Sequence, residues 1–374
     1  MNMTTANPNW IMHPGLYIKE EMEERGWNQR DLAFILGVPE QAITLILSGK
    51  RGISADMARA LGDAFDVHPD LFANLQRDYD MAQAKQPKAD VALLGKMHVN
   101  YPVREMVNRG WLMKSTAVML EEQLVRFFEV SGPEDIPYMP HAAKKSRYEE
   151  RKIPPAQLAW LFRVRQIAKS ISVPKYSDKA LREVVSELPR WTINPEDTRQ
   201  VPKLLMEAGV RFILVEKLPN SKIDGVCFWL DSESPVIGMS TQRDTIDNFW
   251  FVVRHEIEHV LQKHGRESEI IDSDLQGDQS NQSEEERIAN DAATAFCVSE
   301  KFDSFMARKK PLYYERDVLA FAGIIQRHPG IVVGQMQRRL NNYAYLTRYL
   351  AKIRQFVLPS AIADGWGQVI PISL

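Results

Sequence analysis

Cysteine is scarce in this sequence, which contains only Cys227 and Cys297 among its 374 residues. The two cysteines lie far apart and form no CxxC pair. The sequence therefore indicates neither a disulfide framework nor a cysteine zinc site. We interpret both cysteines as small core residues.

Long apolar runs and a strong net charge are also missing. No stretch approaches the roughly 20 apolar residues that a membrane-spanning helix requires, and residues 1–10 lack the charged-then-apolar order of a secretory signal. We therefore expect a cytoplasmic protein with no membrane partner. Because the net charge is only −2 at pH 7, any binding to nucleic acid must come from local geometry and a local basic patch.

The length predicts two or three domains, since domains average roughly 150 residues. Closely spaced amphipathic segments predict an all-α first domain over residues 12–80, and the polar stretch 81–90, which contains a proline, predicts a linker. We interpret residues 81–154 as this linker followed by a helical middle segment. Residues 155–374 form the last predicted domain.

Within this last domain the helical periodicity gives way to three strand patterns, at residues 211–215, 225–230 and 235–239. A long helix over about 244–263 and a second helix over about 284–298 follow them. The expected fold class is therefore α+β: an all-α N-terminal domain, a helical middle segment and a C-terminal domain with a small sheet.

Residues 28–52 have helix-turn-helix spacing. Asn28 can cap the first helix through its side-chain oxygen, and Gly37 allows a positive φ at the turn. The second helix begins near Pro39. Ile43 and Ile46 are predicted to face the core of this domain.

The outward positions of the second helix are then Gln41, Thr44 and Ser48. Glutamine can pair with adenine in a bidentate manner and threonine can contact a thymine methyl group. Lys50 and Arg51 follow directly and are expected to meet phosphates. A helical bundle without nucleic acid fits the same spacing, and the modest excess of acidic residues in the first 85 positions favours that alternative.

The run from His13 to Leu61 resembles the HigA-type antitoxins of bacterial toxin–antitoxin modules, which are Cro/repressor-like helix-turn-helix proteins. The resemblance covers nearly all of the first domain. It implies binding to operator DNA and to a cognate toxin. A homodimer is expected from the geometry of two DNA half-sites.

Residues 255–259 read HEIEH, the HExxH pattern of zincins. His255 and His259 are one helical turn apart and can bind one ion, while Glu256 points toward water on that ion. A catalytic zinc requires a third protein ligand and an open position. We choose Glu286, on the next helix, as the third ligand. Asn290, one turn later on the same face, is expected to support Glu286. Spacing alone fits a solvated acidic helix start equally well.

The strand patterns, the HEIEH run and the segment EERIANDAATAF (residues 285–296) resemble the ImmA/IrrE metallopeptidases. The second motif of that family, ExxANxxA, matches Glu286, Ala289, Asn290 and Ala293. The resemblance implies that Glu286 is the third zinc ligand, that Zn²⁺ is the cofactor, that the C-terminal domain is zincin-like and that such proteins act on helix-turn-helix repressors.

Two functions follow. In the first, a DNA-binding antitoxin or transcriptional regulator carries a zinc-dependent endopeptidase that cleaves a regulatory protein, with Glu256 as the general base. In the second, the zinc domain of a non-proteolytic repressor is a sensor or a toxin-docking platform.

Several further residues have suitable chemistry without a defined role. The strand at 235–239 is expected to bind an extended substrate by strand addition. Candidates for stabilising an oxyanion are Tyr313, Tyr314, His264 and His328. His141 and the basic loop 144–147 are candidates for contact with DNA or a toxin. Residues 304–374 show no chemistry that we can interpret and are expected to close the core.

Overall fold

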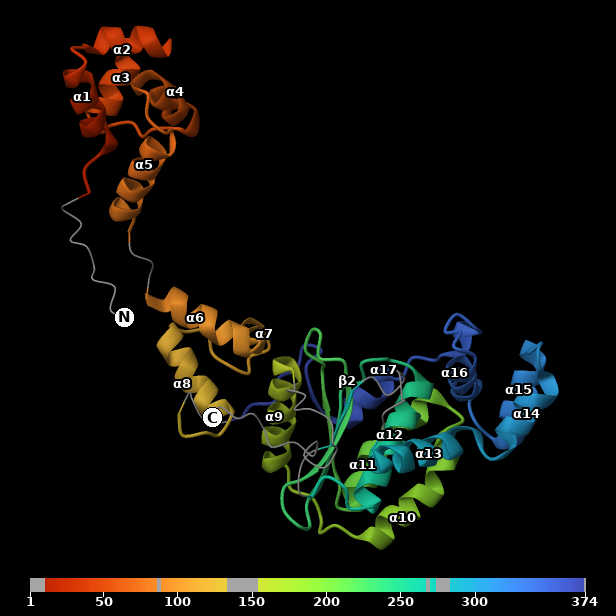
Figure 1. Cartoon of the computed structure of the whole chain (residues 1–374). Helices are drawn as coiled ribbons and strands as arrows, with labels where there is room; N and C mark the ends of the chain where they lie inside the picture. The colour runs from red at the N-terminus through yellow and green to blue at the C-terminus, as the bar shows by residue number, and fades with distance from the viewer. Residues whose placement is uncertain (1–10, 86–88, 133–153, 267–269, 274–282, 373–374) are drawn as a thin grey trace. The chain divides into compact units, whose positions relative to one another are not determined.

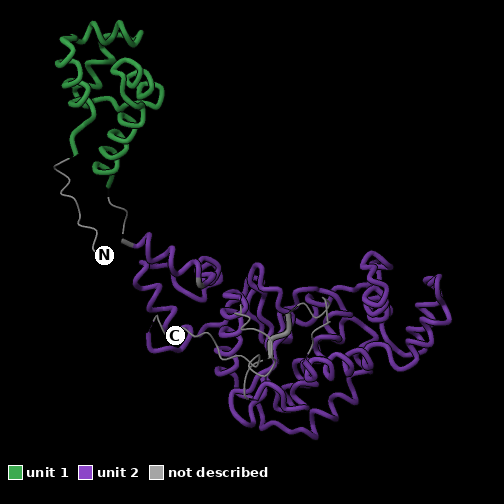
Figure 2. The backbone as a smooth tube through the Cα atoms, in the orientation of Figure 1, with its two compact units in different colours: residues 1–88 green, residues 89–374 purple. Residues whose placement is uncertain are grey.

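The computed structural model describes residues 11–85, 89–132, 154–266, 270–273 and 283–372. The chain divides into two compact units, residues 1–88 and residues 89–374 (Figure 2). The described residues are mostly helical, with one small mixed sheet, in line with the predicted α+β class. His141 and residues 144–147 lie outside the described residues. No helix in the described ranges is long and apolar enough to span a bilayer.

Unit 1 is a five-helix domain (Figure 1). Its helices are α1 Pro14–Glu24, α2 Gln29–Leu36, α3 Glu40–Leu47, α4 Ala55–Phe65 and α5 Asp70–Gln83. As predicted, Asn28 caps α2: its side chain accepts hydrogen bonds from the backbone amides of Arg30 and Asp31. Gly37 ends α2 at a φ of 64°, a conformation that favours glycine and turns the chain into α3.

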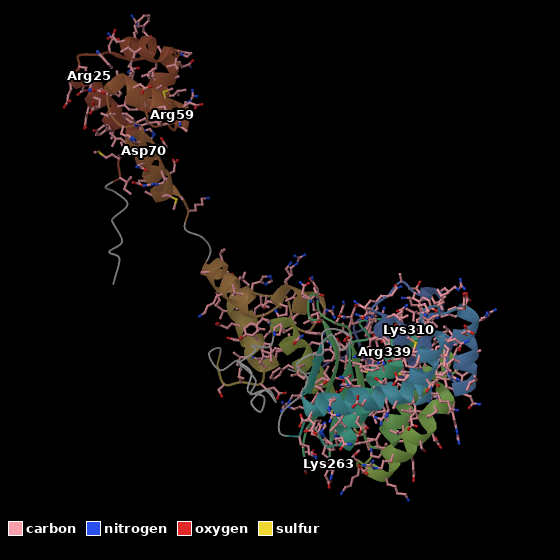
Figure 3. The ribbon with its side chains drawn as sticks, turned by 45° about the vertical axis from the view of Figure 1, so that its right-hand side comes forward. Arg25, Arg59, Asp70, Lys263, Lys310 and Arg339 are labelled. Atoms are coloured by element: carbon pink, nitrogen blue, oxygen red, sulfur yellow. The ribbon has the colours of Figure 1, made fainter. Side chains whose placement is uncertain are left out.

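The core of unit 1 is formed by aliphatic side chains of helices α1 to α4 and by Phe65 and Phe72. Ile43 and Ile46 are buried in this core, as the periodicity of α3 predicts. Arg25, labelled in Figure 3, joins the end of α1 to α4. Its guanidinium donates a hydrogen bond to the Phe65 carbonyl at 2.8 Å and lies 5.2 Å from the centre of the Phe65 ring.

Unit 2 begins with helices that precede its sheet. These are α6 Ala89–Asn100, α7 Val103–Asn108, α8 Ala117–Phe127, α9 Pro155–Ser170, α10 Asp178–Glu187 and α11 Val201–Glu207, with 3-10 turns η4 Leu188–Trp191 and η5 Pro195–Gln200. The strands and the helices among them are β1 Arg211–Val215, β2 Ile223–Trp229, β3 Pro235–Met239, α12 Ile246–Leu261, β4 Ile270–Ser273 and α13 Glu284–Val298. The chain ends with α14 Lys301–Lys309, α15 Glu315–Ile325, α16 Pro329–Leu340, η6 Thr347–Tyr349, α17 Arg354–Val357, η7 Leu358–Ser360 and β5 Ile362–Asp364.

The sheet of unit 2 has the strand order β4-β2-β3-β1-β5. Strand β1 runs parallel to β3 and β5, whereas β2 runs antiparallel to β3 and β4. Helices α9 and α12 lie on opposite faces of the sheet (Figure 1). Two strand glycines allow this close packing: Gly238 faces Val164 of α9, and Gly225 faces Glu256 of α12.

The prediction that residues 235–239 bind an extended substrate by strand addition is wrong. This segment is β3, and its backbone pairs with β1 on one side and β2 on the other. Its amide and carbonyl groups are therefore already used within the sheet, and β3 offers no free edge to which a substrate strand could be added. Sequence alone did not reveal this because a central strand and an edge strand share the same apolar pattern.

The middle helices α6, α7 and α8 pack into the core of unit 2. Leu120, Leu124 and Phe127 of α8 share an apolar cluster with Trp160 of α9 and with residues of the sheet. The sequence-based division assigned residues 81–154 to a segment of their own; in the structure α5 extends to Gln83 and the helices from α6 onward belong to the second unit. The C-terminal residues close this core, since β5 pairs with β1.

Asp364 at the end of β5 ties these distant segments together. Its buried carboxylate accepts hydrogen bonds from the Trp111 indole at 2.8 Å, the Arg163 guanidinium at 2.5 Å and the Ile370 amide at 3.0 Å. These donors come from the loop before α8, from α9 and from the C-terminal tail. Such a buried charge is tolerated only when its partners satisfy it.

Replacing Asp364 by alanine would leave the buried Arg163 guanidinium without its counter-charge. We expect Asp364→Ala to lower the free energy of unfolding of unit 2 by about 3–5 kcal/mol, measured by urea unfolding followed by tryptophan fluorescence. Asp303→Ala is the matched control, because Asp303 forms a surface ion pair at 3.0 Å with Arg339, which is labelled in Figure 3. Such a pair contributes less than about 1 kcal/mol. Equal losses in the two variants would contradict this account.

Candidate functional site

The structure presents two candidate sites, one in each unit. In unit 1, Gln41 and Thr44 of α3 and its C-cap residue Ser48 are all exposed, as predicted, and the exposed residues Lys50 and Arg51 follow. Gly49 adopts a φ of 73° and lets the chain leave α3 directly in front of these basic residues. The phosphate-binding candidates therefore follow the base-reading candidates within a few residues of the chain.

The side chain of Thr44 is already engaged. Its hydroxyl donates to the side-chain oxygen of Gln29 at 2.8 Å and also lies 3.1 Å from the Glu40 carbonyl oxygen. Gln29, at the start of α2, thereby joins the exposed surface beside α3, and the sequence analysis missed it. Its contact with Thr44 connects two helices, so the spacing within α3 gave no signal for it.

In unit 2, His255, His259 and Glu286 meet although Glu286 belongs to a different helix. The Nε2 atoms of the two histidines are 3.0 Å apart. The Glu286 carboxylate oxygens lie 3.5 Å from Nε2 of His255 and 3.4 Å from Nε2 of His259. Helices α12 and α13 lie side by side and bring these groups together (Figure 1).

Ligand atoms at about 2.0–2.2 Å from a tetrahedral zinc lie about 3.3–3.6 Å from one another. The two distances from Glu286 to the histidines fall in this range, and the two Nε2 atoms, at 3.0 Å, are slightly closer together. Both imidazoles are buried, whereas the Glu286 side chain is 21% exposed. The three side chains could therefore hold one metal ion and leave a position open toward solvent.

Local capping positions Glu286. The hydroxyl of Ser283 accepts a hydrogen bond from the Glu286 amide at 3.2 Å and begins α13. The adjacent Glu284 and Glu285 are exposed, so Glu286 is the member of this acidic run that contacts the histidines. Asn290, one turn further along α13, is buried.

The charge state of Glu286 reflects this pairing. Burial by itself raises the pKa of the Glu286 carboxyl group, but hydrogen bonds from His255 and His259, together with their charge, hold that pKa well below its usual range. The group is therefore an anion at neutral pH, which is the form that binds a cation.

Glu256 is completely buried on α12, against β2. A Cβ atom added to Gly225 would lie 1.8 Å from Oε1 of Glu256 and 3.1 Å from a methyl carbon of Val252. Only glycine at position 225 leaves room for this carboxylate. The one sequence signal was a glycine inside an otherwise apolar strand, which often marks a close approach.

His264 lies behind His259. Its Nδ1 atom is 3.0 Å from Nδ1 of His259, so one of the two rings donates a proton to the other. Burial and the neighbouring His259 lower the pKa of His264. Because this contact uses the nitrogen of His259 that faces away from Glu286, His264 orients the His259 ring.

The remaining candidates for oxyanion stabilisation are engaged elsewhere. The hydroxyl of Tyr313 donates to the Met306 carbonyl, and Nδ1 of His328 accepts from the Gly330 amide to cap α16. Tyr314 is 53% exposed at the start of α15. The structure therefore brings His264, but not these three residues, to the histidine pair.

A methyl group at position 225 should disturb Glu256 specifically. We expect Gly225→Ala to destabilise unit 2 by about 1–3 kcal/mol through overpacking, and we expect much of that loss to be relieved when Glu256 is also replaced by alanine. Urea unfolding of both single variants and of the double variant gives the coupling energy. Gly323→Ala is the control, because no atom lies within 4 Å of its added Cβ. Strictly additive effects of the two substitutions would contradict the steric account.

Known proteins resemble the N-terminal part of the chain. A helix-turn-helix family model matches residues 18–72. Virulence-associated protein A' of Dichelobacter nodosus is 42% identical over 99 residues, a match that covers 26% of this chain and 82% of the relative. Virulence-associated protein I of the same bacterium is 32% identical over 84 residues, which cover 22% of this chain and 78% of the relative.

Solved structures also resemble this part. The Pseudomonas aeruginosa antitoxin HigA with the higBA promoter is 32% identical and covers 24% of this chain and 92% of that chain, with a TM-score of 0.19. The family model and the two virulence-associated relatives decide the assignment: through its N-terminal unit, this chain belongs to the helix-turn-helix family that includes virulence-associated proteins A' and I.

Proposed function

We propose that this protein is a cytoplasmic, operator-binding regulator of the antitoxin type whose second unit is a zinc-dependent, zincin-like endopeptidase acting on a regulatory protein. The observation that carries the regulatory part is the helix-turn-helix domain with α3 exposed. The observation that carries the peptidase part is the group formed by His255, His259 and Glu286, next to the buried Glu256.

The DNA-binding proposal rests on the residues that α3 exposes. In helix-turn-helix proteins the second helix enters the major groove and its outward side chains contact base edges. Gln41 and Ser48 are exposed for such contacts, and Thr44 is exposed with its hydroxyl bound to Gln29, so the contact we assign to Thr44 is between its methyl group and thymine. The net charge of the chain is slightly negative, so Lys50 and Arg51 provide the positive charge locally. Homodimerisation on paired half-sites is part of this proposal.

The peptidase proposal assigns the three donor side chains as zinc ligands. A zinc ion supplies Lewis acidity, which lowers the pKa of water and polarises a carbonyl group. Glu256 is assigned as the general base, because its carboxylate follows the first ligand directly and Gly225 fixes where it can lie. It would accept a proton from the attacking water and return one to the leaving amine. Asn290 would support Glu286, and His264 would hold the ring of His259 in place.

A second candidate function is a non-proteolytic regulator in which the same zinc site is a sensor or a toxin-docking platform. The observation that favours it is the limited opening of the site, because the histidines and Glu256 are fully buried and only Glu286 is part-exposed. Under the peptidase function the proposed partner is a separate repressor or the N-terminal unit of this chain. Under the second function the proposed partner is a cognate toxin.

Loss of the basic residues after α3 should weaken DNA binding without changing its sequence preference. We expect Lys50→Ala and Arg51→Ala each to lower the affinity for the promoter fragment upstream of the gene and to reduce the slope of log K against log salt by about one. Gln41→Ala should instead reduce discrimination between that fragment and random DNA. Lys19→Ala, on α1, is the control. Gel shifts at several salt concentrations measure all four variants, and unchanged salt slopes would count against phosphate contacts at positions 50 and 51.

Removing any one proposed ligand should abolish zinc binding. We expect about one zinc per chain in the purified wild type, and none in His255→Ala or Glu286→Ala, by elemental analysis. Glu256→Gln should retain the metal because Glu256 is not a ligand. Glu285→Ala is the matched control for Glu286→Ala, since its exposed side chain neighbours the site without entering it. Metal that persists in Glu286→Ala would refute the three-ligand assignment.

The Glu256→Gln protein also separates the two candidate functions. If the chain is a peptidase, cleavage of the regulatory protein or of its own N-terminal unit stops in this variant while its zinc remains. If the site is a sensor or a docking platform, repression and toxin neutralisation persist and no cleavage occurs in either protein. Cleavage that continues unchanged in Glu256→Gln would exclude the proposed mechanism.

A further inference from the structure

Unit 1 contains a groove that neither the DNA-binding surface nor the proposed zinc site uses. It has a volume of about 590 Å³ and lies along the crossing of α1 and α5. On α1 its wall runs from Pro14 to Glu20, and on α5 it runs from Leu75 to Ala82. At 1.5 Å per residue each wall is about 10 Å long, which is enough for about two turns of an incoming helix.

The lining of the groove is mostly apolar and open to solvent. Ring contacts between Tyr17 and Phe72 and between His13 and Tyr79 join α1 and the residue before it to α5. Two methionines of the lining, Met12 just before α1 and Met81 on α5, are 63% and 71% exposed. Flexible, exposed methionines are typical of surfaces that adapt to a partner helix.

The two helices that form the groove carry an excess of negative charge. Helix α1 contains Glu20, Glu21, Glu23 and Glu24 with one basic residue, Lys19, and α5 contains Asp70, Asp78 and Asp80 with one basic residue, Arg77. Lys19 pairs with Glu23, Arg25 at the C-cap of α1 pairs with Glu21, and Arg77 pairs with Asp78, so acidic residues still outnumber basic ones. Glu20 and Asp78 line the groove itself.

The acidic residues around the groove affect the pKa of Tyr17, which lines it. Burial and the charges of Glu21, Glu24 and Glu20 raise the pKa of its hydroxyl group. A second copy of this groove would meet it with like charge, which disfavours direct self-association through this surface. A cationic partner would instead be attracted.

We propose that the groove between α1 and α5 binds a basic amphipathic helix of a partner protein, with apolar side chains entering between Met12 and Met81 and lysine or arginine side chains reaching the acidic rim. This is the helix-in-groove mode of peptide recognition. No residue of the groove belongs to α2, α3 or the basic stretch at positions 50 and 51. The inference therefore goes beyond the proposed DNA-binding and peptidase functions and does not depend on either.

The test uses the full chain and a designed probe. The probe is a fluorescent helical peptide of about 14 residues with leucine at positions i, i+3, i+4 and i+7 and lysine elsewhere; a second peptide carries glutamate in place of every lysine. Fluorescence anisotropy at physiological salt should show saturable binding of the lysine peptide and none of the glutamate peptide. We expect Met81→Lys and Glu20→Lys each to lower the affinity about tenfold.

Two control variants make the same charge changes outside the groove. Met113→Lys alters a methionine of unit 2 that is 75% exposed, and Glu23→Lys alters a carboxylate on α1 that does not line the groove. Both should bind the lysine peptide within about twofold of wild type. The proposal is overturned if the peptide fails to bind, if controls and groove variants lose affinity equally, or if sedimentation shows a dimer that Met81→Lys dissociates.

Discussion

The packing of α12 between the sheet and α13 is the constraint on which the architecture of unit 2 depends. This helix is buried on nearly every side, and it carries two imidazoles and the Glu256 carboxylate into the interior of unit 2. Polar groups at such depth are costly unless they are satisfied by partners. Glu286 supplies such a partner to the two imidazoles from the α13 side, and Gly225 leaves room for the Glu256 carboxylate on the sheet side.

The same principle organises the rest of the chain. Asp364 satisfies buried donors from three distant segments and thereby fixes the middle helices and the C-terminus onto one core. In unit 1, by contrast, the candidate DNA-binding residues on α3 and the basic residues that follow it are exposed. Unit 1 therefore presents its candidate binding residues to solvent, whereas unit 2 encloses its candidate metal ligands.

Sequence reasoning succeeded where the relevant contacts are local. The helix boundaries near Asn28 and Gly37, the exposure of Gln41, Thr44 and Ser48, and the common face of His255 and His259 all follow from periodicity and capping within a few residues. It failed where partners are distant in sequence. The central position of β3, the contact of Gln29 with Thr44, the place of Gly225 beneath Glu256 and the position of His264 behind His259 depend on tertiary packing. The choice of Glu286 among three adjacent glutamates needed the resemblance to a family, because spacing alone left it open.

The most direct test of the central claim is X-ray absorption spectroscopy of the zinc-loaded full chain at the zinc edge. The account predicts two imidazole nitrogens from His255 and His259 and oxygen donors that include the Glu286 carboxylate, with no sulfur, at distances of about 2.0–2.2 Å. In Glu286→Ala, which lacks this ligand, the same preparation should give no zinc absorption edge. A sulfur ligand, or a spectrum with fewer than two imidazoles, would contradict the proposed site and the function built on it.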